Sequence, residues 1–321
     1  MTAETLGTAA TLETARTPVT DPLGEDALET AGALLDEPGS PARLRLEALV
    51  DDLFARRAAL GAADLAALRP LAETGLRELD RGRLRAARPV LSGERHGGWV
   101  VDTFVKKLIL LSFVTMDSVV AASAPGRPRT FDKLPLKFED WETVDFDTAR
   151  VRAVPGAVVR YGAYLGPGVV LMPSFVNVGA YVGAGTMVDT WATIGSCAQI
   201  GERCHISGGA GIGGVLEPIG DAPVVIEDGV FVGARSEVAE GVRVGRGAVL
   251  GMGVYLGRST PIVDRASGEV SYGEIPPGAV VVPGSRADPR RPEISTYAAV
   301  IVKYADDRTR GKTALNDLVR S

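Results

Sequence analysis

Histidine and cysteine are scarce in this chain, with two of each among 321 residues. A zinc site built on three histidines cannot be assembled from His96 and His205 of one chain, so we expect no metal site. The same scarcity disfavours a histidine general base, although His205 stays open as a candidate. Cys197 and Cys204 lie within an apolar repeat, where buried free thiols are a better expectation than a disulfide or a catalytic pair.

Long apolar runs are missing as well, and so is the basic, then apolar, then small-residue order of a signal peptide. We therefore expect no membrane association and, by default, a cytoplasmic protein. The formal net charge is −5, and residues 1–42 alone carry eight acidic residues against one basic residue. The rest of the chain therefore sums to about +2, which leaves room for an anionic ligand. We expect no nucleic-acid partner.

The first part of the chain is predicted to hold a tail followed by helices. Residues 1–42 are rich in Ala, Thr, Glu and Pro without sustained periodicity, which predicts an acidic, disordered tail. Apolar residues at helical spacing then predict three helices, over 43–60, 62–79 and 99–114. A short strand at 83–91 and a turn at 92–98 are expected between the last two. Residues 43–140 are thus predicted to form an α-rich domain.

A bulky apolar residue returns at every sixth position through the middle of the chain. It occurs ten times from Val158 to Ile212 and, after a spacing of fourteen residues, seven more times from Ile226 to Ile262. A period of six is typical of a parallel β-helix, in which three hexads make one triangular coil. We therefore predict a mainly β fold with five to six coils over 141–285. The expected inward anchors are Val158, Tyr164, Val170, Val176, Val182, Val188, Ile194, Ile200, Ile206, Ile212, Ile226, Val232, Val238, Val244, Leu250, Leu256 and Ile262.

Functional residues are expected where the repeat is interrupted, because a scaffold alone specifies no chemistry. Asp189 stands where the repeat prefers Gly or Ala, and the run SGGAGIGG occupies 207–214. A loop is predicted near 213–225 and an excursion near 263–278. The C-terminal segment, 286–321, is expected to hold a strand at 297–304 and a short basic helix at its end.

Three strings carry a close resemblance to a known family. They are MPSFVNVGAYVGAGTMVDTWATIGSCAQIGERCHISGGAGIGGVLEP at 172–218, IEDGVFVGARSEVAEGV at 226–242 and MGVYLGRST at 252–260. Together with WVVDTFVKKLILLSF and AVIVKYADDRTRGKTALNDL, they resemble the 2,3,4,5-tetrahydropyridine-2,6-dicarboxylate N-succinyltransferases, within the hexapeptide acyltransferase superfamily. The likeness covers about residues 43–321 and leaves the acidic tail unmatched.

The resemblance implies both a fold and a reaction. The coils would be left-handed, and three chains would form a homotrimer with active sites shared between adjacent subunits. The reaction would move a succinyl group from succinyl-CoA to the amine of a ring-opened dicarboxylate, giving N-succinyl-2-amino-6-oxopimelate and CoA on the diaminopimelate route to lysine. Succinyl-CoA would be a co-substrate, and no permanently bound cofactor is implied.

The family's catalytic and substrate-binding residues carry over to positions of this chain. The catalytic pair would be the Asp of MVDTW, Asp189, and the Glu of GARSEV, Glu237, because a carboxylate can accept or orient a proton of the attacking amine. Arg152 matches the family's arginine for the substrate carboxylates, which suit bidentate Arg better than Lys. Arg235 and Glu217 are weaker candidates for substrate binding.

Further residues are expected to serve CoA and the transition state. Coil backbone with exposed donors, at Ser236 and Gly251, and the cation of Lys312 are candidates for binding CoA. The N–H groups of Gly211 and Gly213, within SGGAGIGG, are candidates for stabilising the oxyanion.

Two alternative functions stay open on the sequence. The chain could be another hexapeptide acyltransferase that modifies a sugar or an amino acid, with acetyl-CoA as a donor. It could also be a catalytically silent β-helix that serves as an assembly module. Asp189, Glu237 and Arg152 together argue against the silent module, because a non-catalytic scaffold has no need of them.

Overall fold

The computed structural model describes residues 40–90, 98–120 and 130–305. Almost all of the predicted tail, most of the turn at 92–98 and the C-terminal basic helix with Lys312 lie outside the described residues. No helix within the described ranges is long and apolar enough to cross a bilayer.

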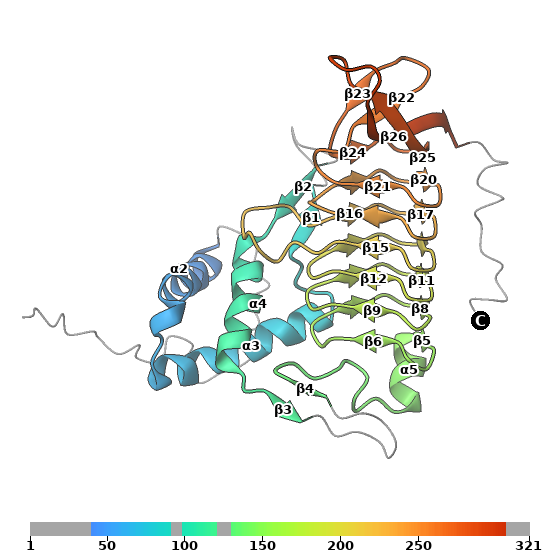
Figure 1. The fold of residues 1–321 in the computed structure, drawn as a ribbon. Helices are drawn as coiled ribbons and strands as arrows, with labels where there is room; N and C mark the ends of the chain where they lie inside the picture. Colours follow the sequence, from blue (N-terminus) through green and yellow to red (C-terminus); the bar gives the residue numbers. More distant parts are fainter. Residues whose placement is uncertain (1–39, 91–97, 121–129, 306–321) are drawn as a thin grey trace, which may run out of the picture.

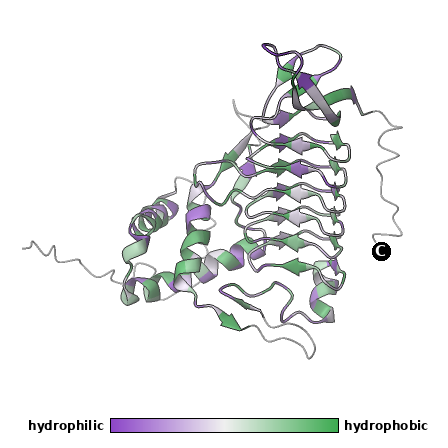
Figure 2. Cartoon of the chain, in the orientation of Figure 1, coloured by the Kyte–Doolittle hydropathy of each residue, from purple (hydrophilic) through white to green (hydrophobic). Residues whose placement is uncertain are grey.

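Three helices and a small hairpin form the N-terminal part (Figure 1). The helices pack their apolar residues against one another. Figure 2 shows both hydrophobic and hydrophilic residues along each helix. The first helix starts at Pro41, with the Ser40 side chain accepting a hydrogen bond from the Arg43 N–H at 3.1 Å. The elements are α2 (Pro41–Ala55), η1 (Arg57–Ala59), α3 (Ala62–Asp80), β1 (Ala87–Pro89), β2 (Trp99–Val101) and α4 (Thr103–Thr115).

The helix predicted from Trp99 was wrong in its first turn. Trp99–Val101 form β2, which pairs antiparallel with β1, and the helix α4 starts only at Thr103. Asp102 sets this boundary, because its carboxylate accepts a hydrogen bond from the Val105 N–H at 3.3 Å and so caps the helix. The first predicted helix likewise ends early, at Ala55, and a 3₁₀ turn follows it.

The connector into the coils holds a short hairpin and a short helix. β3 (Val119–Val120) pairs antiparallel with β4 (Phe131–Asp132), and α5 (Thr143–Ala149) lies at the base of the coils.

The central part forms the predicted left-handed parallel β-helix, whose three faces are parallel sheets. We name each face after its first strand. The β6 face comprises β6 (Val158–Val159), β9 (Phe175–Val176), β12 (Thr193–Ile194), β15 (Gly211–Ile212), β18 (Glu237–Val238) and β21 (Tyr255–Leu256). The β7 face comprises β7 (Tyr164–Leu165), β10 (Tyr181–Val182), β13 (Gln199–Ile200), β16 (Val225–Ile226), β19 (Arg243–Val244) and β24 (Glu274–Ile275).

The third face extends into the C-terminal cap. The β5 face comprises β5 (Arg152–Ala153), β8 (Val170–Leu171), β11 (Met187–Val188), β14 (His205–Ile206), β17 (Phe231–Val232), β20 (Val249–Leu250) and β25 (Ala279–Ala287). β26 (Ser295–Tyr304) pairs antiparallel with β25 and parallel with β22 (Ile262–Asp264), which forms a hairpin with β23 (Val270–Ser271).

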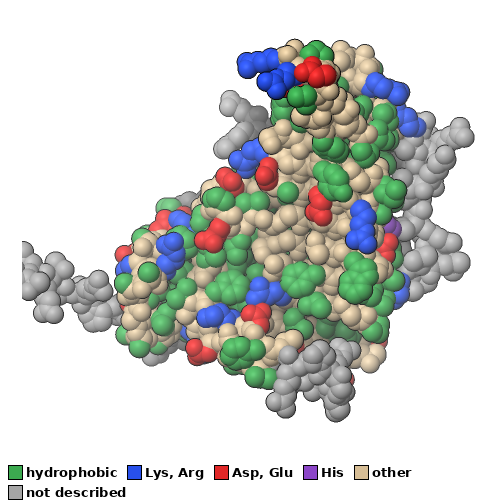
Figure 3. Space-filling view, in the orientation of Figure 1, with side chains coloured by type: hydrophobic (Ala, Val, Ile, Leu, Met, Phe, Trp, Pro, Cys, Tyr) green, Lys and Arg blue, Asp and Glu red, His purple; other side chains and the backbone are tan. Residues whose placement is uncertain are grey.

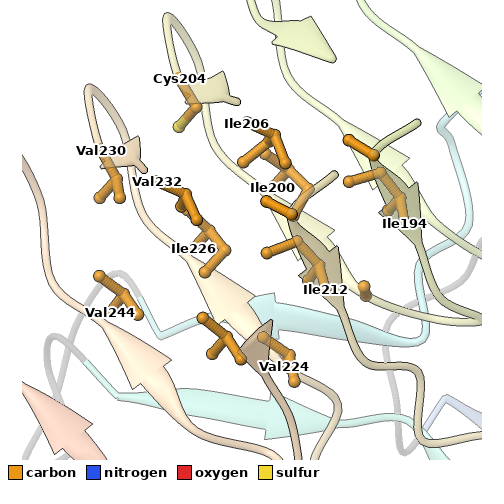
Figure 4. Close-up of a cluster of buried hydrophobic side chains, with 14 of the residues drawn as sticks. Ile194, Ile200, Cys204, Ile206, Ile212, Val224, Ile226, Val230, Val232 and Val244 are labelled. Atoms are coloured by element: carbon orange, nitrogen blue, oxygen red, sulfur yellow. The ribbon is translucent and has the colours of Figure 1, made fainter. Parts of the chain in front are cut away.

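The coil interior is a continuous apolar column, part of which Figure 4 shows. Every predicted anchor from Val176 onward is buried in it, with the small residues packed at the corners. The first three anchors were wrong by one residue, because Val159, Leu165 and Leu171 face inward in place of Val158, Tyr164 and Val170. Register with the next coil fixes this: Val159 pairs with Val176 and Leu171 with Val188.

The helical part covers the β7 face and leaves the β6 face open. The Arg85 guanidinium lies 3.6 Å from the Tyr181 ring centroid, and its Nε donates to the Gln199 side chain at 3.0 Å. The Lys137 ammonium and the Asp80 carboxylate add an ion pair at 2.8 Å. On the β6 face Thr193, Glu237 and Tyr255 stay exposed, and Figure 3 shows one side of the molecule with hydrophobic and charged side chains interspersed.

Candidate active site

Three stacked turns where the β5 face meets the β6 face carry three of the predicted site residues, Asp189, Arg235 and Ser236. We call this column the site corner; it comprises Asp189–Ala192, Ser207–Ala210 and Gly233–Ser236. The Gly209 N–H donates to the Thr190 carbonyl at 2.8 Å, and the Arg235 N–H donates to the Gly208 carbonyl at 3.1 Å. These bonds stack the turns in register, so residues far apart in sequence share one edge.

Asp189 follows β11 and begins the first turn of the site corner. Its N–H donates to the Ile206 carbonyl at 2.9 Å, which fixes the backbone in the ladder. Its Oδ1 accepts from the Thr190 N–H at 2.7 Å and lies 3.3 Å from the Thr190 hydroxyl. With one oxygen held by Thr190 and the side chain 32% exposed, the carboxylate is both fixed and accessible.

His205 is the residue of the next coil that lies beside Asp189. Its Nε2 is 3.8 Å from Asp189 Oδ2, and its side chain is only 13% exposed. The ring stacks on Phe231, with centroids 5.0 Å apart and an interplanar angle of 16°. His205 is therefore held in place on β14 with an edge toward the Asp189 carboxylate.

Glu237 points outward from β18 on the β6 face and lies over Gly211. A Cβ atom at position 211 would collide with the Glu237 carboxylate, so glycine there makes room for the acid. Partial burial raises the pKa of Glu237 above the usual value for a glutamate.

Arg235 lies over Gly209 in the same way. Gly209 has φ +65°, and a Cβ atom there would come within 2.8 Å of the guanidinium carbon. Glycine at this position thus serves both a left-handed backbone conformation and the close approach of a cation.

Asp189 does not meet the other two principal candidates within one chain. Glu237 lies on β18, and Asp189 lies just before β12. On the β6 face, β15 is the one strand between β12 and β18. Arg152 is exposed on β5, and only β8 lies between β5 and β11. At about 4.8 Å per strand, each of these residues lies two coils, or about 10 Å along the axis, from Asp189.

The N–H groups predicted as oxyanion donors are already bonded within the coils, and so are the polar groups of two predicted CoA contacts. The N–H groups of Gly211 and Gly213 already donate to Ser236 and Val238 carbonyls, at 2.8 and 2.7 Å. The Ser236 side chain is fully buried, and its hydroxyl donates to the Gly251 carbonyl at 2.9 Å and accepts from the Val254 N–H at 3.1 Å. The Gly251 N–H donates to the Val281 carbonyl at 2.7 Å, so it is not available to CoA.

The predicted loop leaves the coils at a different corner, between the β6 and β7 faces. Lys106 of α4 is buried and donates to the Pro218 and Asp221 carbonyls, each at 2.9 Å, which ties the loop to the helices. Desolvation lowers the pKa of this lysine. Glu217 is exposed in this loop and is not part of the site corner. The interruption of the repeat therefore does not bring Glu237 toward Asp189.

The two cysteines are buried and free, as predicted. Burial raises the pKa of each thiol, Cys197 and Cys204, to about 12, so neither supplies a thiolate nucleophile at neutral pH. Within the described ranges, no three His, Cys, Asp or Glu side chains gather as metal ligands.

Sequence reasoning missed the exposed aromatic residue beside the catalytic candidate. Trp191, in the string MVDTWATIG, has φ 61° and is 71% exposed at the tip of its turn. Met252, three turns along the same corner, and Tyr255, three strands along the β6 face, are 72% and 50% exposed. Trp191 thus lies in the turn of Asp189, whereas Met252 and Tyr255 lie one coil beyond Arg235 and Glu237.

Comparisons with known proteins match both parts of the chain. A family model described as the hexapeptide repeat of succinyl-transferase matches residues 223–258, and one described as tetrahydrodipicolinate N-succinyltransferase N-terminal matches residues 45–115. Protein TabB of Pseudomonas amygdali pv. tabaci is 67% identical over 85% of this chain and 98% of its own length.

Relatives named for an activity match at similar coverage. A 2,3,4,5-tetrahydropyridine-2,6-dicarboxylate N-succinyltransferase of Gluconobacter oxydans is 56% identical over 88% of this chain and 99% of its own length. A crystal structure from Campylobacter jejuni, assigned as a 2,3,4,5-tetrahydropyridine-2-carboxylate N-succinyltransferase, has a TM-score of 0.50 at 15% identity. It covers 83% of this chain and 85% of that one, and the likeness concerns the fold.

Proposed function

This chain belongs to the 2,3,4,5-tetrahydropyridine-2,6-dicarboxylate N-succinyltransferase family, and we propose that it transfers a succinyl group from succinyl-CoA to the amine of ring-opened tetrahydrodipicolinate. The products are N-succinyl-2-amino-6-oxopimelate and CoA, in the succinylase branch of diaminopimelate and lysine biosynthesis. The observation that carries this proposal is the fixed, accessible Asp189 carboxylate within a chain that is 56% identical to a named member along nearly its whole length.

The amine must lose a proton as it attacks the thioester, and Asp189 is the proposed acceptor or orienting group. Thr190 holds one carboxylate oxygen, which leaves the other directed away from it for the amine. Attack on a thioester needs no covalent enzyme intermediate, because the thiolate is a good leaving group. Succinyl-CoA is therefore a co-substrate, and the chain needs no permanently bound cofactor.

The two substrate carboxylates call for cations at the site. Arg235 is one candidate, because its turn lies at the same corner as Asp189, two coils above the turn of Thr190. Arg152 is a second candidate on the β5 face. Glu217 stays a weaker proposal, since its loop lies at a different corner, and Lys312 stays a proposal for binding CoA.

A homotrimer would solve the problem of the separated catalytic carboxylates. Asp189 and Glu237 stand about 10 Å apart along the axis of one chain, too far for one amine to contact both. The exposed side chain of Trp191 lies in the turn of Asp189, Tyr255 pairs with Glu237, and with Met252 they are exposed apolar groups that a neighbouring copy would bury. We propose that Asp189 of one subunit and Glu237 of the next complete each site.

Release of CoA from succinyl-CoA tests this function. We expect thiol release that depends on the cyclic dicarboxylate, with less release from acetyl-CoA or glutaryl-CoA. Efficient turnover of acetyl-CoA with a sugar or an amino acid would favour the alternative acyltransferase. Absence of release with every donor and acceptor would favour the silent assembly module.

A further inference from the structure

We infer that His205 is a second proton acceptor at the amine site and acts with Asp189 as a pair; this rests on the proposed function. Two observations carry the inference. His205 Nε2 faces Asp189 Oδ2 at 3.8 Å, and the two side chains reach each other from adjacent coils, on β14 and just after β11.

The distance fits a substrate atom between the two groups. At 3.8 Å the histidine nitrogen and the carboxylate oxygen are too far apart for a direct hydrogen bond. One amine nitrogen can lie within about 2.9 Å of both and donate one N–H to each. The carboxylate has its other oxygen held by Thr190, so Oδ2 is the oxygen left for the amine.

The histidine is positioned for this task before substrate arrives. Stacking on Phe231 fixes the plane of the ring, and only 13% of the His205 side chain is exposed to solvent. The strands on either side present Met187 and Phe231 to the ring, and neither of these residues titrates. Asp189 is a charged group beside it, with Nε2 and Oδ2 3.8 Å apart, whereas Arg152 in the same column of strands lies two coils from Met187.

The pair provides a better base than a carboxylate alone. A neutral imidazole accepts protons near neutral pH, where an aspartate is a weak base. In the reaction the amine nitrogen forms a bond to the succinyl carbonyl carbon and the carbon–sulfur bond breaks. The amine proton passes to the imidazole, Asp189 stabilises the imidazolium that forms, and the CoA thiolate takes up the proton to leave as the thiol.

Two variants of the full-length protein test the pair. His205→Gln keeps a polar side chain of similar length but cannot titrate, and His205→Ala opens a space that added imidazole can fill. We expect His205→Gln to lower kcat by about 100-fold or more while the KM for succinyl-CoA changes little. The acid limb of the pH profile of kcat/KM should be lost in His205→Gln. Imidazole should restore part of the turnover of His205→Ala and none of that of Asp189→Ala.

The outcomes separate the pair from the proposed function. A wild-type protein that releases no CoA from succinyl-CoA would contradict the proposed function and the pair with it. An active wild type with His205→Gln within about threefold of it would contradict the pair alone. A variant that loses activity but keeps the acid limb, with no rescue of His205→Ala by imidazole, would assign His205 a purely structural role and also overturn the inference.

Discussion

Single residues at the site corner are shaped by the side chain that lies on them. Gly209 adopts a left-handed conformation beneath the Arg235 guanidinium, and Gly211 lies beneath the Glu237 carboxylate. In both cases the missing Cβ makes space for a charged group from the next coil. The sequence analysis predicted that the glycine-rich run SGGAGIGG supplies oxyanion donors. In the structure its glycines leave space for the side chains of Arg235 and Glu237.

Replacement of Gly209 by alanine should displace Arg235 and weaken substrate binding. The left-handed backbone alone costs an alanine about 1–2 kcal/mol, and the collision with the guanidinium is added to it. We expect the KM for the dicarboxylate to rise by about tenfold, as a lost charge-assisted contact would give. Gly229→Ala is the matched control, because Gly229 has φ +68° with no atom near its missing Cβ. An equal rise in KM for both variants would disprove a role of Arg235.

Glu237 should cost the protein stability at neutral pH. Burial raises its folded pKa above the unfolded value, so the folded state binds the proton more tightly and is favoured at low pH. That advantage is lost as pH rises from the ordinary glutamate pKa of about 4.3 through the raised pKa of the folded state. We expect Glu237→Gln to unfold at a higher temperature than wild type at pH 7.5 and at the same temperature at pH 4. Glu73→Gln, exposed on α3, changes the same charge elsewhere and should show no such difference.

At the scale of the elements, the period of six predicted most of the β-helix but could not fix its first coil. Val158–Val159, Tyr164–Leu165 and Val170–Leu171 each offer two apolar residues, so the pattern alone does not say which one faces inward. Strand pairing with the second coil determines which residue faces inward, and this pairing is part of the tertiary structure. The strand at Trp99–Val101 was missed for a similar reason, because an apolar run continues into α4 and only Asp102 marks the boundary.

The repeat did contain the signal that Ser236 is structural. It stands at the small inward position of its hexad, as Thr186 does, and the two hydroxyls make the same contacts. Thr186 donates to the Gly201 carbonyl at 2.8 Å and accepts from the Cys204 N–H at 2.9 Å. Each hydroxyl therefore bridges two coils at a buried corner. The spacing of three hexads puts His205 in the coil next to that of Asp189, but only the structure shows that the two side chains approach each other.

Ser236→Ala should therefore lower stability and leave CoA binding unchanged. The Gly251 carbonyl and the Val254 N–H would lose a buried partner, which costs about 1–3 kcal/mol of unfolding free energy. Denaturant unfolding measures this cost, and steady-state kinetics measure the KM for succinyl-CoA. Thr186→Ala should behave alike in both assays. A clear rise in the KM for succinyl-CoA in Ser236→Ala, without one in Thr186→Ala, would contradict this structural role and support a contact between Ser236 and CoA.

For the whole molecule, the proposed trimer predicts that two inactive variants complement each other. Asp189→Asn and Glu237→Gln subunits, mixed in equal amounts and assembled together, should form some sites that have both acids intact. Random assembly gives about one quarter of the wild-type turnover when the acids come from different subunits. If both acids of one site belong to the same chain, the mixture should stay as inactive as either variant alone.

The most direct measurement is CoA release from succinyl-CoA by the wild type and by Asp189→Asn. The change keeps the size of the side chain and its contact with the Thr190 N–H, but it removes the negative charge. We predict release that requires the cyclic dicarboxylate in the wild type, and a loss of at least about 100-fold in kcat in the variant with its fold intact. Equal turnover by the two proteins would contradict the assignment of Asp189, and no turnover by the wild type would contradict the function itself.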